Sequence, residues 1–148
     1  MGDAEATTRL DDLVARFIAG TIPHAEWTHG AHLMVGTWHV HQYGPEEALG
    51  RLRVGIRALN DAHGTPNSAT SGYHETVTRA YVRLLAEFLA GCPAEMPLTE
   101  RVARVLAGPL AVKDVLARFY SRARLMSAEA RAAWVEPDLA PLRHGEDG

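Results

Sequence analysis

Two short stretches carry residue types that could perform chemistry, residues 27–33 (WTHGAHL) and residues 72–76 (GYHET). In the first stretch His29 and His32 lie three positions apart, which puts both rings on one face of a helix. Two imidazoles at this spacing can ligate one metal ion. Glu26 precedes His29 by three positions, the Glu-x-x-His spacing of helical di-iron bundles, and is a reserve ligand. The first stretch therefore predicts a metal-binding helix face.

The second stretch supplies a third imidazole and a carboxylate. His74 falls on the apolar face of its predicted helix, where an unpaired polar group costs about 1–3 kcal/mol. If the two helices are neighbours, His29, His32 and His74 form a site with three nitrogen ligands and an open position. Such ligands suit a divalent transition metal, Zn, Fe, Cu, Ni or Mn. Glu75 is then a fourth ligand or the general base, and Tyr73 is the second predicted catalytic residue.

Four further side chains are candidates for binding a substrate. Trp27 adjoins the first histidine pair, and His39 follows on the same helix arc but about 10 Å along the axis from His32, so it can line the same cavity. One of the two arginines Arg124 and Arg131 could bind a substrate carboxylate or phosphate with two hydrogen bonds. The alternative for Arg131 is an ion pair with Asp138 that fixes the end of the chain.

These residues predict an enzyme, a metal-dependent hydrolase or lyase that acts on a small molecule. An Fe- or Cu-dependent oxidase or oxygenase at the same residues is an open alternative. Metal-free acid–base catalysis by His74 and Glu75 is another. The histidines can also be inert and Glu75 a favourable first-turn residue, which leaves a non-catalytic helical ligand-binding module.

The elements that must position these residues are predicted to be helices throughout. Apolar residues recur at helical spacing, and no stretch alternates as a half-buried strand does. We expect four long helices in a bundle-like core, with a smaller helical C-terminal part packed on it. The predicted helices cover residues 6–19, 23 or 28 to 43, 45–64, 71 or 72 to 90, 99–106, a segment that carries Val112 to Phe119, and 128–134.

Size and composition limit the remaining possibilities. The 148 residues fit one helical domain, residues 1–148, whose end from about 143 is expected to fray. A net charge of -3 and the lack of a long apolar run speak against nucleic acid or a membrane as partner. Cys92 is the one cysteine, and the N-terminus lacks a signal-peptide pattern, so we expect a cytoplasmic protein. Small helical domains often dimerise, which makes a homodimer an expectation.

The motifs also resemble a widespread set of small, all-helical bacterial proteins. Those proteins run roughly F-T-H-x-x-H-L, then Y-H-E-T, then Y-Y-S, L-x-S, A-R and W-V-x-P-D-L, and the resemblance covers nearly the whole chain. It implies one motif system but supplies no reaction. This chain differs in having Trp27 where Phe is usual and a longer loop before Gly72. The residues that the resemblance groups together are His29, His32, Tyr73, His74, Glu75, Thr76, Tyr120, Ser121, Arg124, Arg131 and Asp138.

Overall fold

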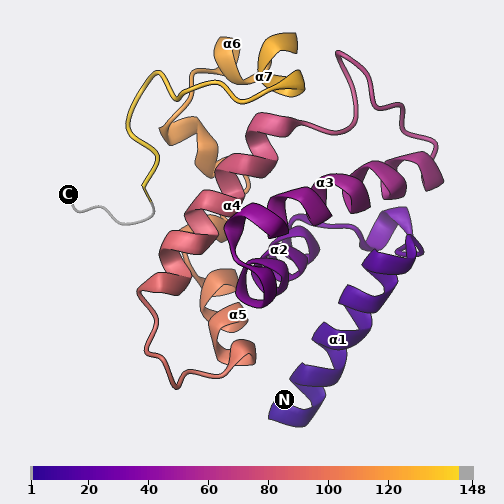
Figure 1. Ribbon diagram of the computed structural model, residues 1–148, viewed down its shortest axis with the longest axis vertical. Helices are drawn as coiled ribbons and strands as arrows, with labels where there is room; N and C mark the ends of the chain where they lie inside the picture. The colour runs from indigo at the N-terminus through magenta and orange to yellow at the C-terminus, as the bar shows by residue number, and fades with distance from the viewer. Residues whose placement is uncertain (1, 144–148) are drawn as a thin grey trace.

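The computed structural model describes residues 2–143, and this part of the chain contains helices and no strand (Figure 1). The prediction of an all-helical fold is confirmed for these residues. Helices α1 to α4 are 15 to 18 residues long, and the later ones are shorter. The order along the chain is α1 (Asp3–Ala19), η1 (His24–Glu26), α2 (His29–Tyr43), α3 (Pro45–Ala62), α4 (Glu75–Ala90), α5 (Leu98–Ala107), η2 (Pro109–Ala111), η3 (Val115–Arg118), α6 (Arg122–Leu125) and α7 (Ala128–Ala132).

Helix α2 lies at the centre, because α1, α3, α4 and α5 all contact it (Figure 1). A helix enclosed by others is expected to be apolar on most sides, and this one is. Gly36 lets α4 come close, since a Cβ there would lie 3.1 Å from Leu85 Cδ1. The buried residues of α2 are Ala31, Leu33, Val35, Gly36, Thr37, His39 and Val40.

Helix α2 begins at His29, so the longer of the two predicted helices, which would begin at residue 23, is wrong. Thr28 caps the helix, because its hydroxyl oxygen accepts the Ala31 N–H at 3.2 Å, and the backbone of Trp27 is not helical. The expectation that Glu26 shares a helix face with His29 is therefore wrong. Glu26 belongs to η1, and its carboxylate pairs with Arg16 at 2.8 Å.

Residues 108–127, which we call the strap, cross from α5 to α7 as short turns. The single helix expected through residues 112–119 is wrong, because η2 and η3 are 3₁₀ turns. Tertiary contacts replace part of the missing helical bonding. Leu139 N–H donates to the carbonyl of Phe119 at 2.9 Å, and His29 Nε2 lies 3.0 Å from the carbonyl of Leu110. The strap thus runs as an irregular wall beside α2 and α4.

The C-terminal segment is fixed to α4 and to the strap by buried hydrogen bonds. Thr76 Oγ1 donates to the carbonyl of Ala133 at 2.9 Å and accepts the Val135 N–H at 3.1 Å. The hydroxyl of Tyr120 donates to the carbonyl of Val135 at 2.7 Å. These contacts explain why a chain without helix beyond α7 still packs in a defined way up to Arg143. The rest of the tail expected to fray, residues 144–148, lies outside the described residues.

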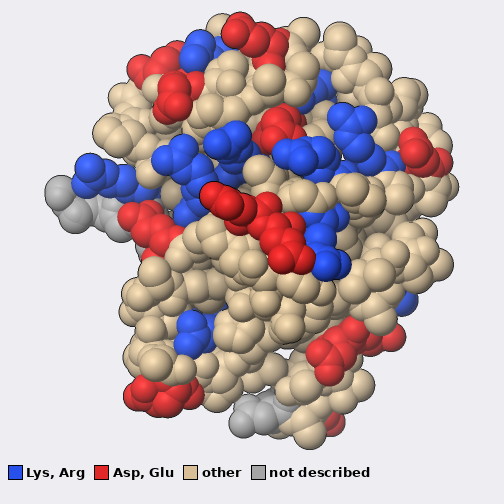
Figure 2. Space-filling model, viewed as in Figure 1, with Lys and Arg blue, Asp and Glu red and all other residues tan. Residues whose placement is uncertain are grey.

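Basic and acidic side chains are intermixed on the surface. Figure 2 shows a band of Lys and Arg across one face, with Asp and Glu between them. Aromatic rings hold several of the arginines, since Arg57 lies over Tyr73, and Arg79 and Arg83 lie over Trp134. None of the helices within residues 2–143 is long and apolar enough to cross a membrane.

Candidate functional site

A pocket of about 850 Å³ lies between α2, α3, α4 and the strap. Its wall is mostly apolar and includes both histidines of the first motif. The strap contributes much of the side that faces α2 and α4. The lining residues are Trp27, Thr28, His29, His32, Leu33, Gly36, Leu52, Ile56, Val77, Thr78, Tyr81, Val82, Leu85, Lys113, Asp114, Leu116, Ala117, Tyr120, Arg122, Leu125 and Met126.

His32 stands at this pocket with its ring held on two sides. Its Nδ1 lies 2.7 Å from the carbonyl of Thr28, and its ring stacks on Trp27 with centroids 3.8 Å apart. The residue is exposed as a whole, yet loss of water around the ring lowers the pKa of His32, against the hydrogen bond to Thr28. This shift favours the neutral form of the imidazole.

His29 lies deeper in the same wall and faces Tyr81. The two ring centroids are 5.7 Å apart, and His29 Nε2 meets the carbonyl of Leu110 at 3.0 Å. Burial raises the pKa of Tyr81 to about 12, and the charge of Asp114 acts in the same direction. The Tyr81 phenol thus keeps its proton.

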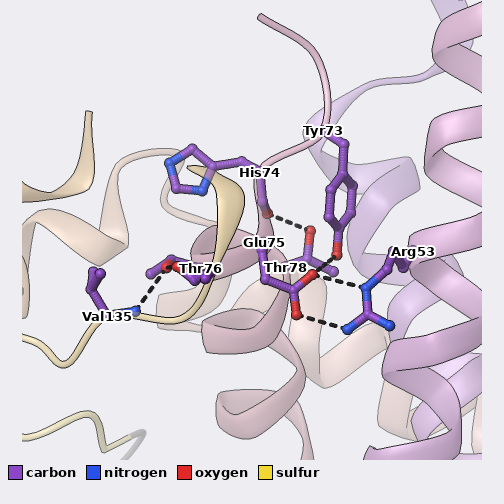
Figure 3. Close-up of polar contacts among 8 residues, drawn as sticks. Arg53, Tyr73, His74, Glu75, Thr76, Thr78 and Val135 are labelled. Carbon is purple, nitrogen blue, oxygen red and sulfur yellow. Dashed lines mark hydrogen bonds and ion pairs between the residues drawn. The ribbon is translucent and has the colours of Figure 1, made fainter. Parts of the chain in front are cut away.

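Glu75 is enclosed by an arginine and a tyrosine (Figure 3). Arg53 donates to both carboxylate oxygens, at 2.9 and 2.7 Å, and the Tyr73 hydroxyl donates at 2.8 Å. The hydrogen bonds from Arg53 hold the pKa of Glu75 below its usual value, although burial opposes them. Burial raises the pKa of Tyr73 to about 12. Neither Glu75 nor Tyr73, the two predicted catalytic residues, is among the residues that line the pocket.

His74 turns its ring away from Glu75, as Figure 3 shows. Val77 N–H donates to Nδ1 at 3.1 Å, which caps α4, and Nε2 lies 2.7 Å from the carbonyl of Leu125. A neutral ring that accepts at Nδ1 donates at Nε2, so both nitrogens are in use. Burial lowers the pKa of His74 and favours this neutral form. The histidine joins α4 to the strap.

The predicted metal ligands do not come together. Among the side chains that the structure describes, those of residues 4–143, no three of His, Cys, Asp or Glu are placed so that they could hold a metal ion. His29 and His32 share the pocket, whereas His74 is not among its lining residues. The physical reason is that His74 and Glu75 are adjacent in sequence, and each is turned by its own partners toward a different element.

The other candidates for substrate binding have structural partners. Trp27 lines the pocket as expected. His39 does not, because it is buried beside Phe17 with its Nδ1 2.8 Å from the carbonyl of Val35. Arg131 donates to the carbonyl of Gly72 at 2.8 Å rather than to Asp138, which the Ser121 hydroxyl and N–H bind instead. Arg124 donates to the carbonyl of Glu136.

Sequence reasoning missed two parts of this arrangement. Arg53 is 22 positions from Glu75, and no spacing rule links an α3 arginine to an α4 carboxylate. The sequence did not predict that the strap forms part of the pocket wall, because its apolar residues repeat at helical spacing and were assigned to one helix.

Comparison with family models, with curated proteins and with solved structures finds no match to this chain.

Proposed function

We propose that this protein binds a small, largely apolar molecule in the pocket between α2, α4 and the strap. The observation that carries the proposal is the pocket itself, about 850 Å³ and lined mainly by apolar side chains. Pockets for small molecules usually measure about 300–1,000 Å³, with apolar walls and a few polar groups that orient the ligand. The proposal corresponds to the non-catalytic ligand-binding module that the sequence left as an alternative, with a small molecule as its partner.

Binding of a neutral dye tests the proposal. N-phenyl-1-naphthylamine brightens in apolar surroundings, and we expect the intact chain to bind one equivalent. Ala117 lines the pocket from the strap. In Ala117→Trp the large apolar indole would move out of water into the pocket and compete with the dye. We expect that variant to bind at least tenfold more weakly. Ala123 is exposed and outside the lining, and Ala123→Trp is the matched control.

A metal-dependent hydrolase or lyase, or an Fe- or Cu-dependent oxidase, is a second proposal with narrower support. His29 and His32 both line the pocket, and each ring has a nitrogen without a protein hydrogen-bond partner among residues 2–143. Two histidines without a third side chain are fewer than the three protein ligands usual for a catalytic zinc. The donor set therefore does not fit the predicted site, and we derive no reaction step through a metal.

Elemental analysis tests this second proposal. It expects near-stoichiometric Zn, Fe, Cu, Ni or Mn in untagged protein, lost in His32→Ala but kept in His41→Ala, since His41 is exposed on the same helix. If the protein binds no metal after reconstitution with each of the five ions, this proposal is contradicted.

We also propose, as the sequence predicts, that the protein is cytoplasmic and forms a homodimer.

A further inference from the structure

The polar groups of the pocket gather where α2 begins and the strap passes. His29 and Tyr81 face each other, His32 stacks on Trp27, and the charge of Asp114 reaches Tyr81. The walls away from this cluster are formed by side chains such as those of Leu52 and Leu85, which are apolar. A ligand that fills the pocket therefore meets one polar end and an apolar remainder.

Hydrogen bonds to main-chain carbonyls decide which ring nitrogens are acceptors. A carbonyl oxygen only accepts, so Nδ1 of His32 carries the hydrogen toward Thr28, and Nε2 of a neutral ring is left as an acceptor. In the same way Nε2 of His29 donates to the carbonyl of Leu110, and its Nδ1 has no hydrogen bond to the described residues. The stacked Trp27 ring limits rotation of His32, so its acceptor direction is set before a ligand arrives.

Tyr81 adds a group that can donate. Its hydroxyl has no hydrogen bond to any of the residues 2–143, although the side chain is half-buried in the pocket wall. In a mostly apolar wall, such a hydroxyl gains a hydrogen bond when a polar group of a ligand meets it. The polar end thus offers imidazole nitrogens together with one phenol hydroxyl that can donate a hydrogen bond to a ligand.

We infer that the ligand carries an uncharged hydroxyl group, as an alcohol or phenol on an apolar body, and that this hydroxyl donates to Nε2 of His32. The inference rests on the proposed function, because it needs the pocket to hold a ligand. A hydroxyl both donates and accepts, so it also matches the free phenol of Tyr81. It is small and neutral, and it enters an apolar pocket without the loss of solvation that a charge would suffer.

Charged head groups fit this end less well. A carboxylate would meet the acceptor nitrogen of His32, which cannot donate a hydrogen bond to it. Lys113, Asp114 and Arg122 are all exposed on the strap, where water and salt weaken the attraction of the two cations and the repulsion of the aspartate alike. An ammonium group would need a buried carboxylate, and Asp114 is exposed.

The test uses three probes with one skeleton, naphthalene, 2-naphthol and 2-naphthoate, each displacing N-phenyl-1-naphthylamine from the full chain at pH 7. We expect 2-naphthol to bind about five- to tenfold more tightly than naphthalene. His32→Phe keeps an aromatic ring against Trp27 but has no acceptor, so the ratio of the two affinities should fall to near one. His41→Phe is the matched control and should keep the ratio, because His41 is exposed on the same helix and outside the pocket.

The ratio within each variant is compared, so a general change in the pocket cancels. The inference is overturned if 2-naphthol binds no better than naphthalene, if His32→Phe keeps the preference, or if 2-naphthoate binds most tightly. Binding of naphthalene without a preference for 2-naphthol overturns the inference alone. Failure of all three probes and of the dye to bind overturns the proposed function and the inference together.

Discussion

Glu75→Gln is the substitution whose effect follows most directly from the structure. The carboxylate accepts three hydrogen bonds, two from Arg53 and one from Tyr73. Gln keeps the size and one acceptor but removes the charge. Hydrogen bonds to a charged group are each worth about 1.5–3 kcal/mol. The Arg53 side chain is 40% exposed and can turn to water. We therefore expect a net loss of about 2 kcal/mol in the free energy of unfolding at pH 7.

The effect should depend on pH with a defined sign. The hydrogen bonds from Arg53 lower the folded-state pKa of Glu75 below its ordinary value of 4.5. A lowered carboxyl pKa stabilises the fold above the unfolded-state pKa, and that stability is lost as pH falls through the folded-state pKa. The difference between the wild-type chain and Glu75→Gln should thus be largest at pH 7 and shrink as pH falls below 4.5.

Urea unfolding followed by circular dichroism at pH 7 and pH 3 measures this difference. Glu46 is the matched control, because it is also in the first turn of its helix but is exposed. Glu46→Gln should lose only the helix-dipole contribution, about 0.3–1 kcal/mol. The reasoning is refuted if Glu75→Gln is no more destabilising than Glu46→Gln at pH 7, or if its effect grows on acidification.

Two more substitutions have matched controls. Gly55→Ala should destabilise the protein, because its Cβ would clash with the buried Phe17 ring. Gly50→Ala on the same helix has open space and should stabilise the protein by about 0.5–1 kcal/mol. Equal shifts in melting temperature for the two variants would contradict this. Thr76→Val removes two buried hydrogen bonds to the C-terminal segment and should cost about 1–3 kcal/mol and speed proteolysis after α7. Thr8→Val on the exposed face of α1 should change stability by less than about 0.5 kcal/mol, and a similar effect at both threonines would rule out the proposed role.

Local signals predicted most helices well. Gly20 ends α1 in a left-handed conformation, Pro45 occupies the first turn of α3, and Ser127 caps α7. These are the positions that Gly, Pro and Ser favour at helix ends. These signals succeed because each acts within a few residues. The long helices α1, α3 and α4 also bury regular apolar faces, so their pattern and their environment agree.

The site was harder to predict because its partners are distant in sequence. His29 and His32 were correctly assigned to one helix face, and both line the pocket. The direction of His74 depends on the carbonyl of Leu125, 51 positions away, and that of Glu75 depends on Arg53. Periodicity says which face of a helix a residue occupies, but not which distant group will bond to it. The prediction of a joint site therefore exceeded what spacing can support.

Methyl NMR during a naphthalene titration tests the central claim, that the pocket binds a small apolar molecule. Leu52, Ile56 and Leu85 line the pocket, whereas Ile18 and Val54 are exposed apolar residues on α1 and α3. The account predicts saturable shifts at the methyl groups of the three lining residues, with none at Ile18 or Val54. Shifts confined to Ile18 and Val54, or no saturable shift at any lining methyl, would contradict it.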